Sequence, residues 1–309
     1  MSIEDVSKEG TWFIEYNTPF SYHVRGIKRV LYSGVTKYQR IAVVEFEDIG
    51  RALILDGKTQ STLYDEFIYH ESLVHPAMIT HPNPRKVLIL GGGEGATARE
   101  VLRHKTVSEV TMVDIDDEVI KVSKEYLPEM SQGAFDDPRL KLVIGDGRKF
   151  IEESRDKYDV IILDLTDPLE GGPSYLLYTV EFYTAIKNRL NDDGIIVTQA
   201  TSTFYALRTF ATIHRTIAAV FPIARAYHVY VPSFDSTWGF VIGSLTHDPI
   251  TLTPEEVDSR IRSRINGELR FYEGAMHRVI FTLPRHIRAV LEDKTIKPAT
   301  DNNPTFLPA

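Results

Sequence analysis

A glycine-rich turn is the first feature of this sequence that points to ligand chemistry. Gly91, Gly93 and Gly95 stand between the apolar run VLIL and the helix-forming run ATAREVL. Glycines let the backbone turn tightly and approach a ligand, and the start of a helix presents unpaired N–H groups. Because Ala96 completes the spacing G-x-G-x-x-A, the turn fits a dinucleotide site as well as a site for an S-adenosyl nucleoside.

Acidic residues at the ends of apolar runs extend this site. Asp114, Asp146 and Asp164 each end such a run, and ligands of open α/β sheets bind at the carboxyl ends of the strands. A carboxylate at Asp114 can accept both ribose hydroxyls, and Asp146 can accept from an adenine amino group, with Gly147 leaving room for the ring. Each acid alone also fits a helix cap or a solvated loop, but their regular order favours a nucleoside site.

Glu94 lies inside the glycine turn and bears on the charge of the ligand. A carboxylate there repels a pyrophosphate and attracts an ammonium group. One such contact at about 4 Å and an effective dielectric constant near 20 contributes about 4 kcal/mol before desolvation. The turn therefore suits a nucleoside with a positively charged end.

A second acidic segment follows the fourth apolar run, in the sequence DLTDPLEGGPSYLLYT. It carries Asp164, Asp167 and Glu170 around a Pro-Gly loop. We expect the segment 60–71 to face it and to contribute Tyr64, Asp65, Tyr69, His70 and Glu71. Carboxylates paired with ammonium groups and rings covering methylene spacers suit a long polyamine. The alternative is a packed helix with a satisfied imidazole, beside a solvated acidic turn.

The elements that must position these residues follow from the hydrophobic periodicity. Strand-like runs alternate with amphipathic helical stretches, which predicts a doubly wound, mostly parallel sheet. The predicted strands are 86–90, 109–116, 140–146, 158–165 and 194–200, and the predicted helices are 97–104, 117–127, 147–154, 179–190 and 208–221. An antiparallel pair, 227–234 and 238–245, and a helix over 286–294 follow.

Before this region, short alternating runs over 24–34, 38–57 and 59–64 predict hairpins. A helix is expected over 65–79, closed by the turn HPNP. The predicted fold class is α/β. A Rossmann-like nucleoside-binding domain of the class I methyltransferase type spans residues 76–309, behind a small antiparallel β domain over residues 1–75.

Composition narrows the chemistry further. The 309 residues include no cysteine, which excludes disulfides, thiolate zinc sites, iron–sulfur clusters and cysteine nucleophiles. With 43 acidic and 35 basic side chains the net charge is −8. This charge disfavours nucleic acid as a binding partner and favours small cationic ligands. The sequence has no long apolar run and begins with an acidic segment, so we expect a cytoplasmic protein without a membrane span.

The chain resembles the polyamine aminopropyltransferases, or spermidine synthase family, over nearly its whole length. The resemblance rests on YQRIAVVE, LDGKTQSTLYDEFIYHE, GGGEGATAREVL, MVDID, GDGR, DLTDP and GIIVTQA, in that order. It implies an enzyme that moves the aminopropyl group of decarboxylated S-adenosylmethionine, its co-substrate, to a polyamine and releases methylthioadenosine. It also implies no permanently bound cofactor, no metal, and a homodimer or homotetramer assembled through the β domain.

The resemblance implies a role for each matching residue in the nucleoside site. Gln39, Asp114, Asp146 and Gly147 would hold the nucleoside, with Pro173 near the adenine. Glu94, with the Asp164 loop, would hold the aminopropyl ammonium. Glu94 would also repel the carboxylate of S-adenosylmethionine.

It also implies roles in the amine site. His70 and Tyr69 would contact the amine, Asp164 would accept its proton, and Asp167 would line the same pocket. We expect Tyr230 and Gln199 among the residues that contact the amine.

Within the family, the chain is most similar to thermospermine synthases, in the segments 81–86, 169–179, 231–241 and 264–269. Val231 stands where spermidine synthases carry Tyr before the proline of their gate loop, with Tyr230 one place earlier. Asp164-Leu165-Thr166-Asp167 replaces their Asp-Ser-Ser-Asp loop. These departures disfavour putrescine as the acceptor and favour a longer or differently shaped amine. The predicted reaction converts spermidine to thermospermine. A spermidine synthase and an agmatine aminopropyltransferase are the alternatives.

Three more distant interpretations each fit part of the sequence. A methyltransferase shares the nucleoside fold, but Glu94 and the acidic loop count against it. A nicotinamide dehydrogenase fits the glycine spacing, but no hydride-handling histidine constellation follows the acidic loop. A non-catalytic polyamine-binding protein has no need of Asp164, Tyr69 and the glycines, all of which are present.

Overall fold

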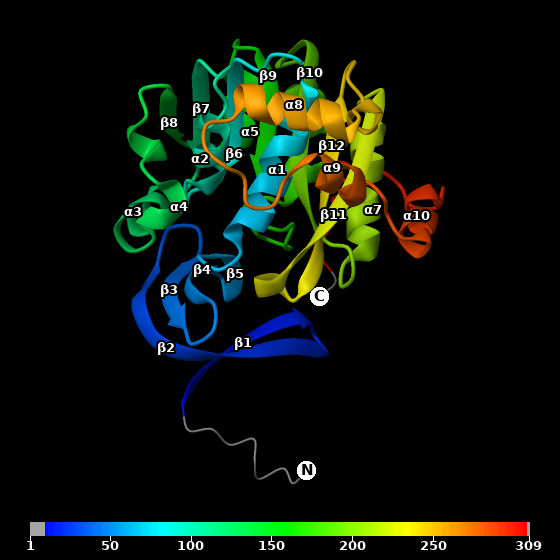
Figure 1. Ribbon diagram of the computed structural model, residues 1–309. Coiled ribbons are helices and arrows are strands. Elements are labelled where there is room, and N and C mark those ends of the chain that lie inside the picture. The colour runs from blue at the N-terminus through cyan, green and yellow to red at the C-terminus, as the bar shows by residue number, and fades with distance from the viewer. Residues whose placement is uncertain (1–9, 308–309) are drawn as a thin grey trace.

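A computed structural model describes residues 10–307 and contains two β-sheets. The first is an antiparallel meander in which each strand pairs with the next along the chain (Figure 1). Its strands are β1 (Thr11–Thr18), β2 (Ser21–Val35), β3 (Arg40–Phe46), β4 (Gly50–Leu55) and β5 (Lys58–Thr62). Asp56 and Gly57, both with positive φ, form the tight turn between β4 and β5, as expected for an Asp-Gly hairpin.

The second sheet has seven strands in the order β11-β12-β10-β9-β6-β7-β8. Its strands are β6 (Lys86–Gly91), β7 (Glu109–Asp114), β8 (Leu140–Ile144), β9 (Tyr158–Asp164), β10 (Leu190–Ser202), β11 (Ile223–Val231) and β12 (Ser236–Ser244). The strands from β10 to β8 run parallel, and β11 and β12 add an antiparallel edge. The sheet order reverses between β6 and β9, where a ligand crevice is expected.

Helices cover both faces of this sheet (Figure 1). One face packs against α1 (Glu66–Thr80), α2 (Ala96–Leu102), α8 (Pro254–Arg264) and α9 (Gly274–Ile280). The other packs against α5 (Gly147–Glu153), α6 (Val180–Lys187), α7 (Leu207–Ala218) and α10 (Arg285–Glu292). The chain also forms α3 (Asp117–Tyr126), α4 (Pro128–Ser131) and short turns of 3₁₀ helix at Ala134–Asp136 (η2), Tyr175–Tyr178 (η3), Pro232–Phe234 (η4) and Pro249–Thr251 (η5).

A separate apolar cluster joins the meander to α3 and α4. Ile41, Val43 and Leu53 of the meander pack with Val119 of α3 and Met130 of α4. All five side chains are nearly or fully buried. Burial of apolar area contributes about 25 cal/mol per Å², so this cluster fixes the meander over the carboxyl ends of β6 and β7.

The fold class predicted from the sequence is confirmed. The helix from 65 to 79 and the parallel strands lie within a few residues of their predicted bounds, but the sequence-based assignment missed β1, α8 and α9. The boundary predicted after residue 75 falls inside α1 and stays a prediction. Among residues 10–307 no helix is long and apolar enough to cross a bilayer, and the cytoplasmic location also stays a prediction.

Candidate active site

Two adjoining cavities lie between the meander and the carboxyl ends of the parallel strands. The glycine-side cavity is lined by residues 90–94, 113–115, 146–147 and 164–166, among others. The hairpin-side cavity is lined by residues of β1, β5, the loop after β9, and the end of β10. Both are lined by Gln39, Tyr69 and Pro173, so a ligand in one cavity meets a ligand in the other.

The glycine turn forms one wall of the glycine-side cavity. A Cβ at Gly91, where φ is +83°, would lie 2.1 Å from the carbonyl oxygen of Asp164, so no other residue fits there. Gly93 also lines the cavity. Gly95 does not: its φ is +85°, and a Cβ there would meet Phe135 at 2.6 Å. The prediction that Gly95 contacts the nucleoside is therefore corrected, because this glycine packs the start of α2 against its neighbours.

The nucleoside residues expected from the sequence gather in this cavity. Gln39, Asp114, Asp146, Gly147 and Pro173 all line it. Burial raises the pKa of Asp114 to about 6. Asp146 also caps α5, with its Oδ1 accepting from the N–H groups of residues 148 and 149 at 2.8 and 3.1 Å. The capping and ligand-binding interpretations of Asp146 are therefore compatible, since the cap uses one of its two oxygens.

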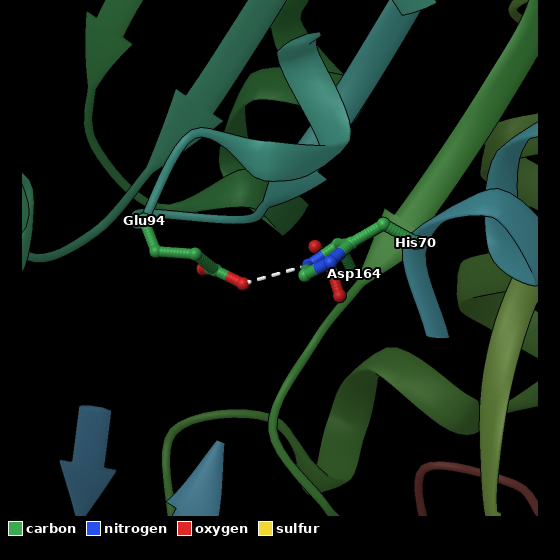
Figure 2. Close-up of side chains that lie close together, drawn as sticks. All are labelled: His70, Glu94 and Asp164. Carbon is green, nitrogen blue, oxygen red and sulfur yellow. Dashed lines mark hydrogen bonds and ion pairs between the residues drawn. The ribbon is translucent and has the colours of Figure 1, made fainter. Parts of the chain in front are cut away.

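Glu94 is held by a buried chain of charges. Its Oε1 lies 3.0 Å from Nε2 of His70. Figure 2 marks this contact with a dashed line. Nδ1 of His70 lies 2.9 Å from a carboxylate oxygen of Glu66, which also accepts from Arg99 at 2.8 Å. Burial opposes a charge on His70, but hydrogen bonds to Glu66 and Glu94 prevail and raise its pKa to about 10. His70 is therefore an imidazolium at neutral pH.

This geometry corrects the role predicted for His70. Its side chain is fully buried, and both ring nitrogens already donate to carboxylates, so it has no donor for the amine. His70, Glu94 and Asp164 offer one potential metal ligand each, within 4.8 Å of one another. Both ring nitrogens of His70 contact carboxylates, however, so a metal ion there would have to displace a proton and break the contact with Glu94.

Asp164 lies at the end of β9, beside the glycine turn. Tyr69 donates its hydroxyl hydrogen to Oδ1 at 2.8 Å, and Thr97 donates to Oδ2 at 2.6 Å. Burial, and then the charge of Glu94, raise the pKa of Asp164 to about 6. Burial raises the pKa of Tyr69, and the nearby carboxylate of Asp164 raises it further. At neutral pH, Asp164 is thus an ionised, oriented base and Tyr69 a hydrogen-bond donor.

A pH dependence follows from the raised pKa of Asp164. Below about pH 6 the carboxylate is protonated and cannot take a proton. An amine acceptor stays fully protonated from pH 5 to 8, since its pKa is near 10. We therefore expect kcat/KM for the acceptor to be level above about pH 7 and to fall about tenfold per unit below about pH 6. Initial rates at saturating nucleoside substrate measure this. A level profile down to pH 4.5 would contradict the assignment.

The hairpin-side cavity has acidic groups and aromatic walls. Asp167 and Glu15 line it with Phe234 and Trp238. Burial raises the pKa of Asp167 to about 6 and also raises that of Glu15. Lys58 lines the same cavity and lowers the pKa of both acids in part. A wall that has both acids and aromatic rings fits a chain of ammonium groups and methylenes.

Gln199 is fixed in this cavity by hydrogen bonds on both ends of its amide. Its Nε2 donates to Asp167 at 3.2 Å and to the hydroxyl oxygen of Tyr178 at 2.8 Å. Its Oε1 accepts from the indole N–H of Trp238 at 3.1 Å. Gln199 therefore lies in the predicted site, where it orients Asp167.

Other residues expected in the amine site lie elsewhere. Tyr230 and Tyr64 are 54% and 57% exposed, and among the described residues neither lines a cavity named above. Glu170 is exposed on its loop. Asp65 accepts from Thr62 and from the backbone of Ser233, and Glu71 accepts from three backbone N–H groups of residues 270–272. Asp65 and Glu71 are both buried and line neither cavity. Their hydrogen bonds stabilise the backbone near residues 233 and 270–272 instead.

Glu15 is the main site residue that the sequence interpretation missed. It is 7% exposed and accepts from the N–H and hydroxyl of Thr59 at 3.0 and 2.7 Å. On β1 it shares a face with Phe13, while Trp12, Ile14 and Tyr16 are exposed. The sequence signal that could have identified Glu15 is a carboxylate on the inward-facing side of a strand with alternating burial.

Comparisons with known proteins agree with this geometry. Residues 66–252 match the family model of the spermine/spermidine synthase domain, and residues 11–62 match that of the spermidine synthase tetramerisation domain. A polyamine aminopropyltransferase of Sulfurisphaera tokodaii is 53% identical over 97% of this chain and 99% of its own. One of Sulfolobus acidocaldarius is 50% identical over the same shares.

Solved structures give the same result. A spermidine synthase in complex with the transition-state analogue AdoDATO superposes with a TM-score of 0.87 at 37% identity, over 94% of this chain and 99% of that chain. The spermidine synthase of Thermotoga maritima gives a TM-score of 0.85 at 36% identity, over the same shares. With a family model matching most of the chain and relatives near half identity over nearly its full length, the chain belongs to the spermine/spermidine synthase family of polyamine aminopropyltransferases.

Proposed function

We propose that this enzyme transfers the aminopropyl group of decarboxylated S-adenosylmethionine to spermidine and forms thermospermine. The observation that carries the proposal is the meeting of the two cavities at Tyr69, whose hydroxyl donates to Asp164 in the glycine-side cavity. The glycine-side cavity offers carboxylates for ribose and for an ammonium group, and the hairpin-side cavity offers both acids and aromatic rings. A structural relative bound to AdoDATO supports the same nucleoside in this cavity.

The reaction is an in-line displacement. The acceptor nitrogen forms a bond to the aminopropyl carbon next to the sulfonium, the C–S bond breaks with its electron pair on sulfur, and methylthioadenosine leaves. The nitrogen must first lose a proton. With an amine pKa near 10.4, this costs about 4–5 kcal/mol at pH 7.

Residues of this chain lower that barrier. The carboxylate of Asp164 takes the proton, and its hydrogen bonds to Tyr69 and Thr97 keep it oriented. A positioned base contributes about 10²–10⁴ in rate. Alignment of the two substrates in adjoining cavities contributes more, because well-oriented reactants reach effective molarities of about 10⁵–10⁸ M. Glu94 binds the aminopropyl ammonium and thereby fixes the carbon under attack.

Three features support an acceptor longer than putrescine. Glu15 places a carboxylate on β1, on an element remote in sequence from Asp164. Phe234 and Trp238 line the cavity as aromatic surface for methylenes. Val231, which stands where spermidine synthases carry a gate-loop tyrosine, is buried in the core.

One assay tests the acceptor. The protein is incubated with decarboxylated S-adenosylmethionine and, separately, with putrescine, agmatine, norspermidine and spermidine. Products are identified by chromatography that resolves thermospermine from spermine. We expect the highest kcat/KM with spermidine and thermospermine as its product. Preferred use of putrescine or agmatine would assign the chain to one of the alternative activities.

Replacing Glu15 by Gln is expected to raise KM for spermidine at least about tenfold with little change in kcat. The charge that would pair with the distal ammonium is lost, and a hydrogen bond to a charged group contributes about 1.5–3 kcal/mol. Steady-state kinetics measure the effect. Glu153→Gln on the exposed side of α5 is the matched control. An unchanged KM in Glu15→Gln would remove this residue from the acceptor site.

We also propose that the chain forms a homotetramer through the meander, as the name of the matching family model suggests. The outer face of β1 and β2 exposes a ladder of apolar side chains. It consists of Trp12, Ile14 and Tyr16, with Tyr22 and Val24 paired across from them. Contiguous exposed apolar patches of this kind mark protein interfaces.

Ile14→Glu is expected to lower the mass of the assembly, because it places a charge in the centre of this ladder. Light scattering coupled to gel filtration measures the mass, and Ile250→Glu, at another exposed apolar position, is the control. A tetramer that persists in Ile14→Glu would assign the interface to a different surface.

A further inference from the structure

The end of the described chain crosses the loop that carries Asp167. We call residues 300–307 the strap. Its near end is anchored at Asp301, whose carboxylate accepts from both terminal nitrogens of Arg148 at 2.9 and 2.5 Å and from the hydroxyl of Thr179 at 2.7 Å. A two-point arginine–carboxylate pair fixes orientation as well as distance. The strap therefore starts from a defined place between α5 and α6.

Its far end is attached to the active-site loop. The backbone N–H of Leu307 donates to the carbonyl of Pro168 at 3.0 Å, directly after Asp167. The carbonyl of Phe306 accepts from Thr209 of α7 at 2.9 Å. The ring of Phe306 lies 5.6 Å from that of Tyr175. These contacts hold the strap against both ends of the loop 165–178.

The strap also contributes a side chain to the site. Leu307 lines the hairpin-side cavity and is not among the described residues that line the glycine-side cavity. It lies in that lining with Leu165 and Leu169, while the acids are Glu15, Asp56 and Asp167. The cavity wall thus combines acidic groups with an apolar section, part of which comes from the strap.

We infer that the strap, through Leu307, is a specificity-determining element for the amine acceptor. This inference rests on the proposed aminopropyl transfer and deepens it. Leu307 offers no hydrogen bond to an ammonium group, and a charge placed against it loses water without compensation. A methylene segment loses nothing there. Leu307 therefore selects acceptors whose charged groups fall at the acids and whose methylenes fall at the strap.

The size of the side chain adds a second criterion. A bulkier residue shortens the space for the acceptor, and one methylene misfit in an apolar pocket changes specificity by about 10–200-fold. We expect a long acceptor to be affected more than a short one, because Leu307 does not line the cavity that holds Asp164. The nucleoside substrate is unaffected, because its cavity has no wall from Leu307.

The test compares Leu307→Trp, Leu307→Ala and the unchanged full-length protein. For Leu307→Trp we expect the ratio of kcat/KM for spermidine to that for putrescine to fall at least about tenfold. For Leu307→Ala we expect weaker discrimination among putrescine, agmatine and spermidine. The Kd of methylthioadenosine, measured by calorimetry, should stay within about twofold in both. Ile250→Trp, at an exposed apolar position outside both cavity linings, is the matched control.

A second variant tests the anchor. Asp301→Ala removes the pairing with Arg148 and Thr179 but replaces no residue of the cavity wall. By releasing the strap, it should weaken discrimination among the acceptors in the same direction as Leu307→Ala. Thermal unfolding checks that each variant is folded. Acceptor ratios that match the unchanged protein in all three variants would overturn the inference and leave the transfer reaction intact. Absence of transfer by the unchanged protein would overturn the proposed function, and the inference with it.

Discussion

Asp164→Asn is expected to lower kcat by about 10²–10⁴ while methylthioadenosine still binds. The amide has nearly the size of the carboxylate and leaves the cavity shape unchanged, but it has no lone pair basic enough to accept a proton from an ammonium. The pKa of Asp164, near 6, is what makes this carboxylate a competent base at neutral pH. Single-turnover rates and calorimetric binding separate the two effects.

Two controls make this result specific to the proton transfer. Asp192→Asn, on an exposed position at the start of β10, controls for a general effect of the substitution. Asp167→Asn should mainly raise KM for the acceptor, since Asp167 lies in the hairpin-side cavity rather than beside the glycine turn. Near-normal kcat in Asp164→Asn would transfer the role of base to another group.

The second large effect concerns Glu94, which should set the choice between decarboxylated and ordinary S-adenosylmethionine. Glu94→Gln is expected to weaken binding of the decarboxylated form and to strengthen the relative binding of the ordinary form. Attraction to an ammonium and repulsion of a carboxylate are lost together. A charge contact at about 4 Å and an effective dielectric constant near 20 is worth about 4 kcal/mol before desolvation, so the ratio of the two Kd values should change by at least about tenfold.

His70 provides the comparison for this measurement. It contacts Glu94 at 3.0 Å but has no access to either substrate. His70→Asn should therefore disturb the orientation of Glu94 and weaken the binding of decarboxylated S-adenosylmethionine. The repulsion between Glu94 and the carboxylate of ordinary S-adenosylmethionine should persist. Equal Kd ratios in Glu94→Gln and in the unchanged protein would contradict the role of Glu94 in discrimination.

Burial of the charged side chains on α1 explains why the sequence-based prediction placed His70 and Glu71 in the amine site. From residue types alone, the segment 60–71 reads as an acidic wall of the amine site. In the structure, α1 packs against the sheet and against α2, and nearly all its residues are buried. Glu66 and His70 are thereby joined to Arg99 in one internal network. Whether a helix has a free face depends on what packs against it, and one sequence does not contain that information.

The sequence by itself determined the parallel sheet and the nucleoside half of the site. Apolar runs of strand length locate β6, β7, β8 and β9, and the carboxyl ends of parallel strands meet at one edge of a sheet. Asp114, Asp146 and Asp164 were therefore brought together by a rule that needs no knowledge of distant contacts. The glycine at position 91 also has a local reason, because the backbone there has a positive φ and lies against the backbone of Asp164.

Only the tertiary structure decided the acceptor half. Its wall combines Glu15 of β1, Trp238 of β12 and Leu307 of the strap, which lie far apart along the chain. Their meeting depends on how the apolar cluster fixes the meander over the second sheet and on how the Asp301–Arg148 pair directs the strap. Periodicity reports which face of an element is buried, but not which element will cover it. That is why the lining of the glycine-side cavity could be predicted from the sequence, whereas the lining of the hairpin-side cavity could not.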